Sequence, residues 1–362
     1  MSHLLSANRF GLVDMPIRFE SVKREAHLLN PITNFSSASQ AIEHRLDPLT
    51  GRSVIVLPGR LEYVKGFVES EDAFIQEMAN QQKEACPFCP AAIDSKAPKF
   101  LPDIVPEGRI TVGEAVCFPS LFAHEDFNAI VVISTSHNLQ LNQVSPDMFA
   151  DAFKACIQYF QRLHNSMPTV KHNAIMMNFL PPAGSTLSHP HIHAMAGDLP
   201  FAEASSLLNA SKSYFDSNGS SYWSDLLETE QRLGVRYLGK IRGVSWLTPY
   251  APMGLNDCQA IIHGTTSADR LSDESLKGLS EGMARILGFY YESGVRSFNF
   301  AIYSAPFGES LDYFDVGFRI VSRYGYKPRF VSDTWAFQYL LGEQEVYETP
   351  EETCAKLKKY FP

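Results

Sequence analysis

Short apolar runs rich in β-branched residues recur along the chain, and polar or turn-forming residues separate them. Runs of this length and composition predict β-strands. The clearest are SVIVLP from Ser53, AIVVIS over 129–134, NAIMMNF over 173–179, QAIIHG over 259–264 and SFNFAIYS over 297–304. Residues 1–40 lack such runs and contain the polar stretch NFSSASQ. We therefore expect an irregular N-terminal arm there.

A long helix is predicted over 145–165, between the second and third of these runs. Ser145 can cap this helix, Pro146 suits its first turn, and Asp147 complements the positive end of the helix dipole. Its apolar residues recur at helical spacing and form one stripe. They are Met148, Phe149, Phe153, Cys156, Ile157, Phe160 and Leu163.

A second helix is expected over about 272–293, with Gly294 as its stop signal. A last helix should begin at the capping box that starts with Thr349 and continues with Pro350, Glu351 and Glu352.

The strand–helix–strand order occurs twice, which indicates an internal repeat. Asn173 and His191 are 18 residues apart, as are Asn299 and Gly317. In that register the first half carries histidines where the second half does not. His189, His191 and His193 align with Asp315, Gly317 and Arg319. Any two α+β units could show such an order by chance.

The predicted fold class is therefore α+β, with two tandem domains that each combine a mostly antiparallel sheet with packed helices. We expect an arm over 1–40, a first domain over 41–205 with the histidines and a metal site, and a degenerate second domain over 206–362. The polar region 198–223 indicates where the two domains meet.

Composition and charge narrow the function classes. Apolar residues make up 45% and charged residues 20% of 362 residues, as is usual for a globular chain of about two domains. The excess of 40 acidic over 31 basic residues argues against a general nucleic-acid binder. The start of the chain lacks a signal-peptide pattern, and no apolar run approaches the ~20 residues needed to cross a bilayer. With six cysteines, too few for a disulfide scaffold, we expect a reduced, cytoplasmic protein without a membrane partner.

The segment His189–Pro190–His191–Ile192–His193 carries the most information about chemistry. Side chains alternate along a strand, so the three imidazoles should share one face. Proline within the run indicates an edge strand or a strand end, where the row could open onto a cleft. The alternative is a solvated or metal-binding histidine cluster without catalysis.

Cys86 and Cys89 form a CxxC pair, the spacing of a structural zinc knuckle or of a redox pair. Zinc needs two further ligands. The histidine row supplies candidates, and His137 at the end of an apolar strand is another. The remaining histidines are expected to be surface or core residues.

Two further features could bind phosphate. The loop PPAGST ends in Ser185 and Thr186, and its small residues would let backbone N–H groups approach an anion, although ordinary turns use the same residues. Arg45, Arg52 and Arg60 lie on or beside the strand that starts at Ser53. Guanidinium groups suit phosphate oxygens, but an isolated arginine is usually a solvated surface charge.

Four motifs occur in an order that resembles the galactose-1-phosphate uridylyltransferase branch of the histidine-triad (HIT) superfamily. They are RLDPLTGRSVIVLPGR, CPFC, a Ser-His pair after an apolar strand, and Asn178 followed after ten residues by His-Pro-His. The resemblance covers roughly residues 43–196, and the C-terminal half matches by layout only. Proteins of this branch have two HIT-like α+β halves and are often homodimers, so the resemblance implies the same fold and allows a homodimer.

The resemblance also implies roles for single residues. His191 matches the nucleophile that forms a covalent nucleotidyl-histidine, and Asn178 matches an asparagine that positions nucleophile and phosphate. Arg60 matches an arginine on the nucleotide phosphates, and Thr186 stands where a serine contacts phosphate; Arg45 and Ser185 are expected beside them. The implied ligands of a structural zinc ion are Cys86, Cys89, His137 and His189.

The sequence departs from the transferases at several positions. His193 replaces a glutamine that the transferases carry two residues after the nucleophile, and this pattern is closer to the hydrolytic branches of the superfamily. At this position His193 could donate a hydrogen bond to the phosphate or protonate the leaving group. Tyr63 occupies a second arginine-like position, the residues near the base are not recognisable in EAVCFPSLF, and the second half lacks a His-x-His.

Three functions follow from these similarities and differences. The first is a nucleotidylyltransferase acting between a nucleoside diphosphate sugar, or a similar nucleotide, and a sugar 1-phosphate or inorganic phosphate. The second is a HIT-type nucleotide hydrolase or phosphoramidase. The third is an inactive, zinc-stabilised nucleotide-binding protein. In each case the expected partners are nucleotides and phosphorylated small molecules.

Overall fold

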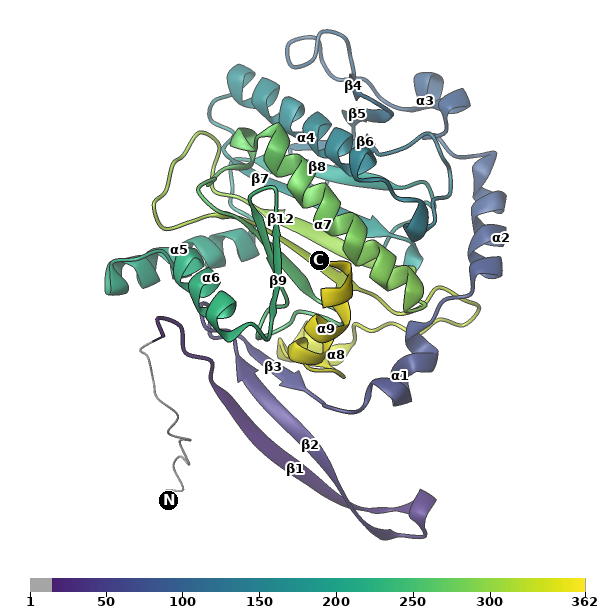
Figure 1. The fold of residues 1–362 in the computed structure, drawn as a ribbon. Coiled ribbons are helices and arrows are strands. Elements are labelled where there is room, and N and C mark those ends of the chain that lie inside the picture. Colours follow the sequence, from purple (N-terminus) through teal and green to yellow (C-terminus); the bar gives the residue numbers. More distant parts are fainter. Residues whose placement is uncertain (1–14, 362) are drawn as a thin grey trace.

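The computed structural model describes residues 15–361, and within that range the body of the protein is built on one ten-stranded sheet (Figure 1). All neighbouring strands of this sheet are antiparallel. From edge to edge they are β4 (Ile110–Val112), β5 (Ala115–Pro119), β6 (Phe127–Val132), β8 (His191–Gly197), β7 (His172–Phe179), β12 (Phe298–Tyr303), β13 (Val316–Ser322), β11 (Cys258–Ile262), β10 (Val244–Leu247) and β9 (Tyr237–Ile241).

The strand order is mirrored about the junction of β7 and β12. Five strands from the first half of the chain run outward on one side, and five from the second half follow the same order on the other. This confirms the α+β class with antiparallel sheet and packed helices, and it joins the two halves in one sheet. Helix α5 (Ala202–Asn218) continues through the expected boundary at residue 205, so the division into domains stays a prediction.

Two long helices cover one face of the sheet, α4 (Pro146–Ser166) and α7 (Asp273–Glu292) (Figure 1). Both begin as predicted: the hydroxyl of Ser145 accepts from the N–H of Met148, and that of Ser272 from the N–H of Ser275. Gly294 follows α7 with φ +77°, a conformation that suits a glycine after a helix end.

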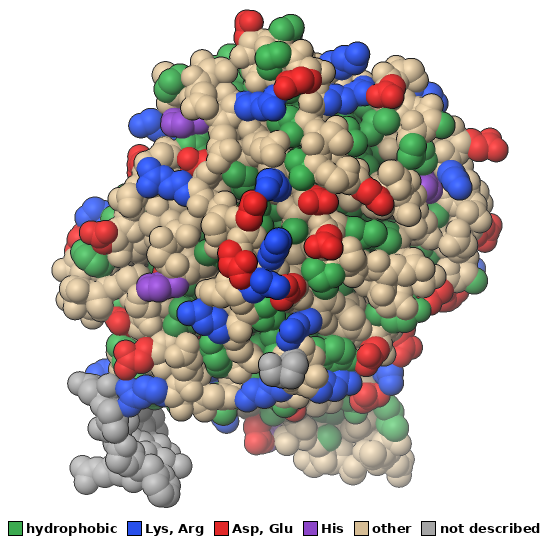
Figure 2. Space-filling model, turned by 45° about the horizontal axis from the view of Figure 1, so that its top comes forward, with side chains coloured by type: hydrophobic (Ala, Val, Ile, Leu, Met, Phe, Trp, Pro, Cys, Tyr) green, Lys and Arg blue, Asp and Glu red, His purple; other side chains and the backbone are tan. Residues whose placement is uncertain are grey.

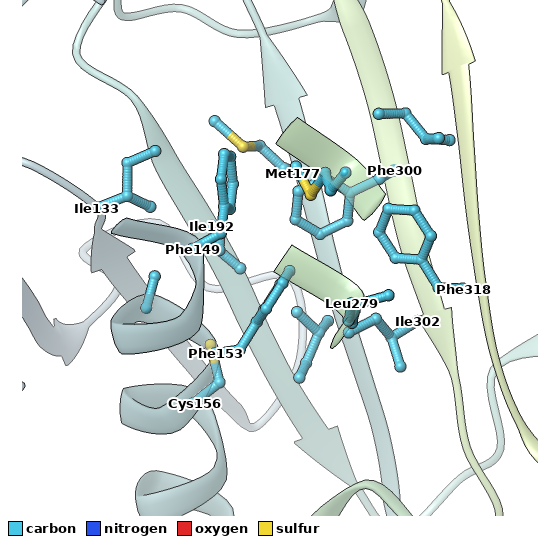
Figure 3. Close-up of a cluster of buried hydrophobic side chains, with 14 of the residues drawn as sticks. Ile133, Phe149, Phe153, Cys156, Met177, Ile192, Leu279, Phe300, Ile302 and Phe318 are labelled. Atoms are coloured by element: carbon cyan, nitrogen blue, oxygen red, sulfur yellow. The ribbon is translucent and has the colours of Figure 1, made fainter. Parts of the chain in front are cut away.

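A continuous apolar core lies between these helices and the sheet. Figure 3 shows Phe149 and Phe153 of α4 packed toward Ile192 of β8 and Phe300 of β12. Because both halves contribute to this core, burial of apolar surface stabilises them together.

The predicted strand register is correct for the histidine row but wrong by one residue for the neighbouring strand. Ile192 on β8 and Phe318 on β13 face the core, so His191 and Gly317 both lie on the opposite face. In β12, however, Phe298 and Phe300 face the core and Asn299 does not, whereas Asn173 of β7 lies on the core-facing side, the side of Ile175 and Met177. Asn299 pairs with Asn178. A shift of one residue along a strand reverses the face of every side chain, so β12 differs from β7 in the face that each matched residue occupies. The connection between β12 and β13 compensates for this shift, because β13 again matches β8.

A second sheet contains β1 (Ser21–Asn30), β2 (Ser36–Leu46), β3 (Ser53–Val56) and β14 (Gln344–Val346). The expectation of an irregular arm is therefore wrong for residues 21–30 and 36–40; residues 1–14 of that arm lie outside the described part. Strands β1 and β2 form a hairpin that projects from the body (Figure 1). Most of its side chains are exposed on both faces, so the sequence shows no apolar alternation there.

Shorter helices complete the described chain: α1 (Leu61–Val68), α2 (Asp72–Lys83), α3 (Pro90–Lys96), α6 (Tyr222–Leu233), α8 (Ala336–Leu341) and α9 (Pro350–Leu357). The capping box at Thr349 starts α9 as predicted. None of the helices within residues 15–361 has the length and apolar character needed to span a membrane. Acidic and basic side chains are interspersed over the face shown in Figure 2.

Candidate active site

Four potential metal ligands converge beside the histidine row. Cys86 and Cys89 lie between α2 and α3, where Cys89 is the residue that precedes the first turn of α3. His137 follows β6, and His189 precedes β8. Their ligand atoms all lie within 4.8 Å of one another.

The distances between these atoms fit tetrahedral coordination. Nδ1 of His189 is 3.6 Å from Sγ of Cys86 and 3.7 Å from Sγ of Cys89, and Nδ1 of His137 is 3.4 Å from Sγ of Cys89. With metal–sulfur and metal–nitrogen bonds typical of zinc, tetrahedral geometry places such pairs about 3.5 Å apart. The cluster can therefore hold a metal ion.

Hydrogen bonding and burial also prepare this cluster for a cation. Nε2 of His189 lies 2.9 Å from the carbonyl oxygen of Ser134, and a proton donated there leaves the lone pair of Nδ1 facing the sulfur atoms. Burial lowers the pKa of His189 to about 4, so its imidazole is neutral. Burial, with the neighbouring Cys86, raises the pKa of Cys89 to about 11. Two thiolates so close together need a positive charge between them.

His191 is the first residue of β8 and is nearly buried, with 8% of its surface exposed. Its Nδ1 lies 2.9 Å from the carbonyl oxygen of His189. Donation of the Nδ1 proton to that carbonyl leaves Nε2 with a free lone pair. Burial lowers the pKa of His191, so the imidazole is neutral near pH 7. The Phe88 ring packs edge-on against it, with ring centroids 5.2 Å apart. A neutral imidazole with a free lone pair on Nε2 is the state that a nitrogen nucleophile requires.

His193 lies two residues further along the same face, with its ring centroid 5.3 Å from that of His191. Burial, and then the neighbouring His191 and His124, lower its pKa to about 4. Its Nδ1 is buried and has no hydrogen-bond partner among residues 15–361. His191 and His193 lie on either side of Ile192, which faces the core, so the row shares one face as predicted. Pro190 stands at a strand end rather than at a sheet edge, because β8 lies between β6 and β7.

Asn178 comes level with His191, because the preceding residue of β7, Met177, pairs with Ile192. Its side-chain oxygen accepts a hydrogen bond of 2.6 Å from the amide of Asn299, a residue of the second half. The loop after β7 holds the two predicted hydroxyl residues. Ser185 is buried and donates to the carbonyl of Leu187, whereas Thr186 is exposed.

The two arginines of the predicted site lie at the second sheet. Arg60 precedes α1 and donates to the side chain of Gln40 at 2.7 Å. Arg45 is buried: Nε donates to Glu43, Nη1 donates to Glu351 and to the carbonyl of Tyr250, and Nη2 lies 3.0 Å from a carboxylate oxygen of Glu351 in an ion pair. Among the described residues, neither arginine hydrogen-bonds to the histidine row. Arg45 therefore links β2 to α9, and its role in binding phosphate stays a prediction.

Sequence reasoning did not identify Phe88, Ser134 or Asn299 as parts of the site. Phe88 lies inside the CPFC motif, and Ser134 contributes only a backbone carbonyl, which no side-chain pattern can indicate. Asn299 gave a weak signal, as a polar residue within an apolar strand.

The chain is similar in sequence to two proteins of interest, although no family model matches it. An uncharacterised protein of Archaeoglobus fulgidus is 27% identical over 340 residues, which are 94% of this chain and 98% of that protein. ADP-glucose phosphorylase of Arabidopsis thaliana is 26% identical over 206 residues, which are 51% of this chain and 56% of that protein.

Solved structures share the fold over nearly their whole length. A galT-like protein of Arabidopsis thaliana superimposes with a TM-score of 0.68 at 18% identity, covering 87% of this chain and 98% of that one. ADP-glucose phosphorylase of the same plant, with bound ADP-glucose, gives 0.66 at 19% identity, covering 88% and 99%. A uridylyltransferase mutant gives 0.64 at 18% identity, covering 88% and 97%. The chain thus has the fold of the uridylyltransferase-like branch that its motifs resemble.

Proposed function

We propose that this protein transfers a nucleoside monophosphate through a covalent intermediate on His191. The observation that carries the proposal is the state of this imidazole: neutral, nearly buried, and held through Nδ1 by the carbonyl of His189 so that Nε2 is free. The similarity to an ADP-glucose phosphorylase and the fold shared with a uridylyltransferase support nucleotidyl transfer as the reaction class.

In the first step, the lone pair of Nε2 attacks the α-phosphorus of a nucleotide donor. The N–P bond forms, the bond to the leaving phosphate oxygen breaks, and the leaving group takes that electron pair. The Nδ1 proton stays on the ring, hydrogen-bonded to the carbonyl of His189, which stabilises the positive charge of the substituted imidazole. In the second step, an oxygen of an acceptor phosphate attacks the same phosphorus, and the N–P electrons return to Nε2.

Neighbouring groups would stabilise the phosphoryl oxygens as charge develops. The amide of Asn178 is level with His191, and His193 offers a neutral imidazole for one further hydrogen bond. We assign Arg60 and Thr186 to the phosphates of the donor, because Arg60 is only partly buried and Thr186 is exposed. Ser185 supports the shape of the loop through its bond to Leu187, and Arg45 is left out of the mechanism.

We further propose that Cys86, Cys89, His137 and His189 hold a structural zinc ion. With four protein ligands such an ion would supply folding energy and keep no position for substrate. Binding at His189 would also fix the backbone carbonyl that orients His191.

For the donor we propose a nucleoside diphosphate sugar, and for the acceptor inorganic phosphate or a sugar 1-phosphate. The neighbour that holds ADP-glucose favours this donor class. Hydrolysis is a second candidate, because His193 places a further, half-buried imidazole with an unpartnered Nδ1 beside the proposed nucleophile. In that case water would take the place of the acceptor phosphate.

Intact-protein mass spectrometry tests the proposal. The protein is incubated with ADP-glucose or UDP-glucose without acceptor, and one of them should add the mass of AMP or UMP. Inorganic phosphate or a sugar 1-phosphate should then discharge the adduct. An adduct that water alone discharges, with no redirection by phosphate, would identify the hydrolase, and no adduct with any nucleotide would identify a binding protein.

The variant His191→Gly should form no adduct, a loss of roughly a thousandfold or more in rate, and should remain folded. An adduct in this variant would remove His191 from the proposed role. Gly317→Ala, on the matching strand of the second half, is the control and should react like the wild type.

A further inference from the structure

One side chain of the second half reaches into the site of the first. Asn299 on β12 stands directly opposite Asn178 on β7, and both point to the face that carries the histidine row. Its amide nitrogen lies 2.6 Å from Oδ1 of Asn178 and 2.9 Å from the carbonyl oxygen of Ala183. Asn299 therefore ties together the end of β7 and the loop that follows it.

Arg323 determines which way the Asn299 amide points. Nη1 of Arg323 lies 2.7 Å from Oδ1 of Asn299. A guanidinium group can only donate hydrogen bonds, so the atom of Asn299 that faces it must be the oxygen. The nitrogen of Asn299 then faces Asn178.

The same reasoning carries over to Asn178. Because Asn299 presents N–H groups, the atom of Asn178 that faces it must be the oxygen. Nδ2 of Asn178, with its N–H donors, is therefore turned away from Asn299, and it lies 3.9 Å from the position that a Cβ at Gly184 would take. A donor beside His191 suits a phosphoryl oxygen, whereas the amide oxygen would repel it.

Arg323 is itself held in place. Its guanidinium makes a bidentate ion pair with Asp333, to which both Nε and Nη2 donate; Nε lies 2.9 and 2.7 Å from the two carboxylate oxygens. Its Nη2 also donates to the hydroxyl of Thr334 at 2.9 Å. Such a bidentate pair fixes the plane of the guanidinium.

We propose that Asn299, oriented by Arg323, is a positioning residue that holds the Asn178 amide with its N–H donors toward the nucleotide phosphate on His191. The inference rests on the proposed function. The half of the chain without a histidine row would thus contribute to the reaction by setting the polarity of one amide, without touching the substrate.

The variant Asn299→Asp tests this directly. A carboxylate still accepts from Arg323 but cannot donate to Asn178, so the Asn178 amide should rotate and turn its oxygen toward the phosphate. We expect the rate of adduct formation, with whichever nucleotide sugar charges the wild type, to fall roughly 100-fold. Asn209→Asp, the same change on the exposed surface of α5, should leave the rate unchanged. A wild-type rate in Asn299→Asp would overturn the inference.

A double-mutant cycle separates positioning from added charge or general loosening. In the Asn178→Ala background, Asn299→Asp should cost less than about threefold further, because its target is gone. Losses that multiply in full would show that Asn299 acts independently of Asn178 and would overturn the inference. Asn299→Leu, which removes the bonds without adding charge, should lose roughly tenfold and covers the case in which the aspartate variant does not fold.

Binding of ADP and UDP, measured by calorimetry, distinguishes this inference from the proposed function. Suppose that the wild type forms no adduct, but that Asn299→Asp lowers nucleotide affinity about tenfold in the wild type and not in the Asn178→Ala variant. This result would refute the reaction and keep the positioning role. Unchanged affinity and unchanged adduct formation in Asn299→Asp would refute the positioning role and keep the reaction.

Discussion

The two halves of the sheet present the same strand face with opposite chemistry. On β8 the face carries His191 and His193, neutral imidazoles with nitrogens left free of protein partners. On β13 the corresponding face carries Gly317 and Arg319. Nε of Arg319 lies 3.0 and 2.8 Å from the two carboxylate oxygens of Asp257, which is enclosed in the protein.

The difference shows what a reactive site needs on this scaffold. On and beside β13 the charged groups pair with one another: besides the Arg319–Asp257 pair, Asp315 accepts from the backbone N–H of Gly264 and lies 2.9 Å from Nδ1 of His263. In the first half His189 and His191 are each held through one ring nitrogen by a backbone carbonyl, which leaves the other nitrogen for a metal or a substrate, and Nδ1 of His193 has no partner within residues 15–361. Complete pairing stabilises, and incomplete pairing leaves chemistry available.

The sharpest test of the first half removes one thiolate of the proposed zinc site. Cys86→Ser should lose the zinc ion and lower the free energy of unfolding by roughly 5 kcal/mol or more, since metal binding contributes directly to folding. Metal analysis and urea unfolding measure both effects. Cys354 is a buried cysteine of the second half, and the control variant Cys354→Ser should retain the zinc ion. If Cys86→Ser also retained one zinc ion per chain, this would contradict the ligand assignment.

A comparable test of the second half breaks its ion pair. Asp257→Asn leaves the buried guanidinium of Arg319 without a counter-charge, so the free energy of unfolding should fall by about 3–5 kcal/mol. Zinc content and adduct formation should persist at temperatures where the variant is folded. Asp216→Asn removes the partner of Lys212 in an exposed pair, which solvent screens, and should leave the urea midpoint close to that of the wild type. Equal effects of the two variants would show that burial of the Arg319 pair does not matter.

The halves should also differ in their response to acid. Burial depresses the pKa of His193 from 6.5 to about 4, so the unfolded chain binds more protons between these values. The stability from this residue is present above pH 6.5 and is lost as pH falls toward 4, by about 2 kcal/mol after allowance for its partial exposure. Burial alone would lower the pKa of Arg319, but Asp257 raises it above its usual value, so Arg319 contributes no such slope.

Urea midpoints of wild type and His193→Gln at pH 7, 5.5 and 4.5 measure this slope. The variant should lose less stability on acidification than the wild type. His27→Gln changes an exposed histidine and should follow the wild type. Parallel curves for His193→Gln and wild type would show that His193 is not held neutral by the fold.

The smallest effect is expected at Gly317, which occupies the position in the second half that matches His191, the proposed nucleophile. A Cβ added at Gly317 would lie no closer than 4.0 Å to its nearest neighbour, the carbonyl oxygen of Ala260. Gly317→Ala should leave the free energy of unfolding within about 1 kcal/mol of the wild type, because packing does not require a glycine there. A loss of more than twice that in thermal or urea unfolding would indicate a close approach at this position.

Much of the site was predictable because its determinants are local. The alternation of the histidine row, the capped stripe of α4 and the CxxC spacing are short-range patterns, and the structure brings the four proposed ligands together as expected. The projecting hairpin was not predictable in the same way. Its strands expose both faces, so no hydrophobic period marks them.

The sequence by itself determined which residues could perform chemistry and on which face of a strand they would lie, because spacing along a regular element fixes side-chain direction. Tertiary structure alone decided which donors remained free. Arg45 meets Glu351 from the far end of the chain, and Asn299 meets Asn178 across 121 residues. Such partners are set by how the strands pair, and the energy of a polar group depends on its partner more than on its place in the sequence.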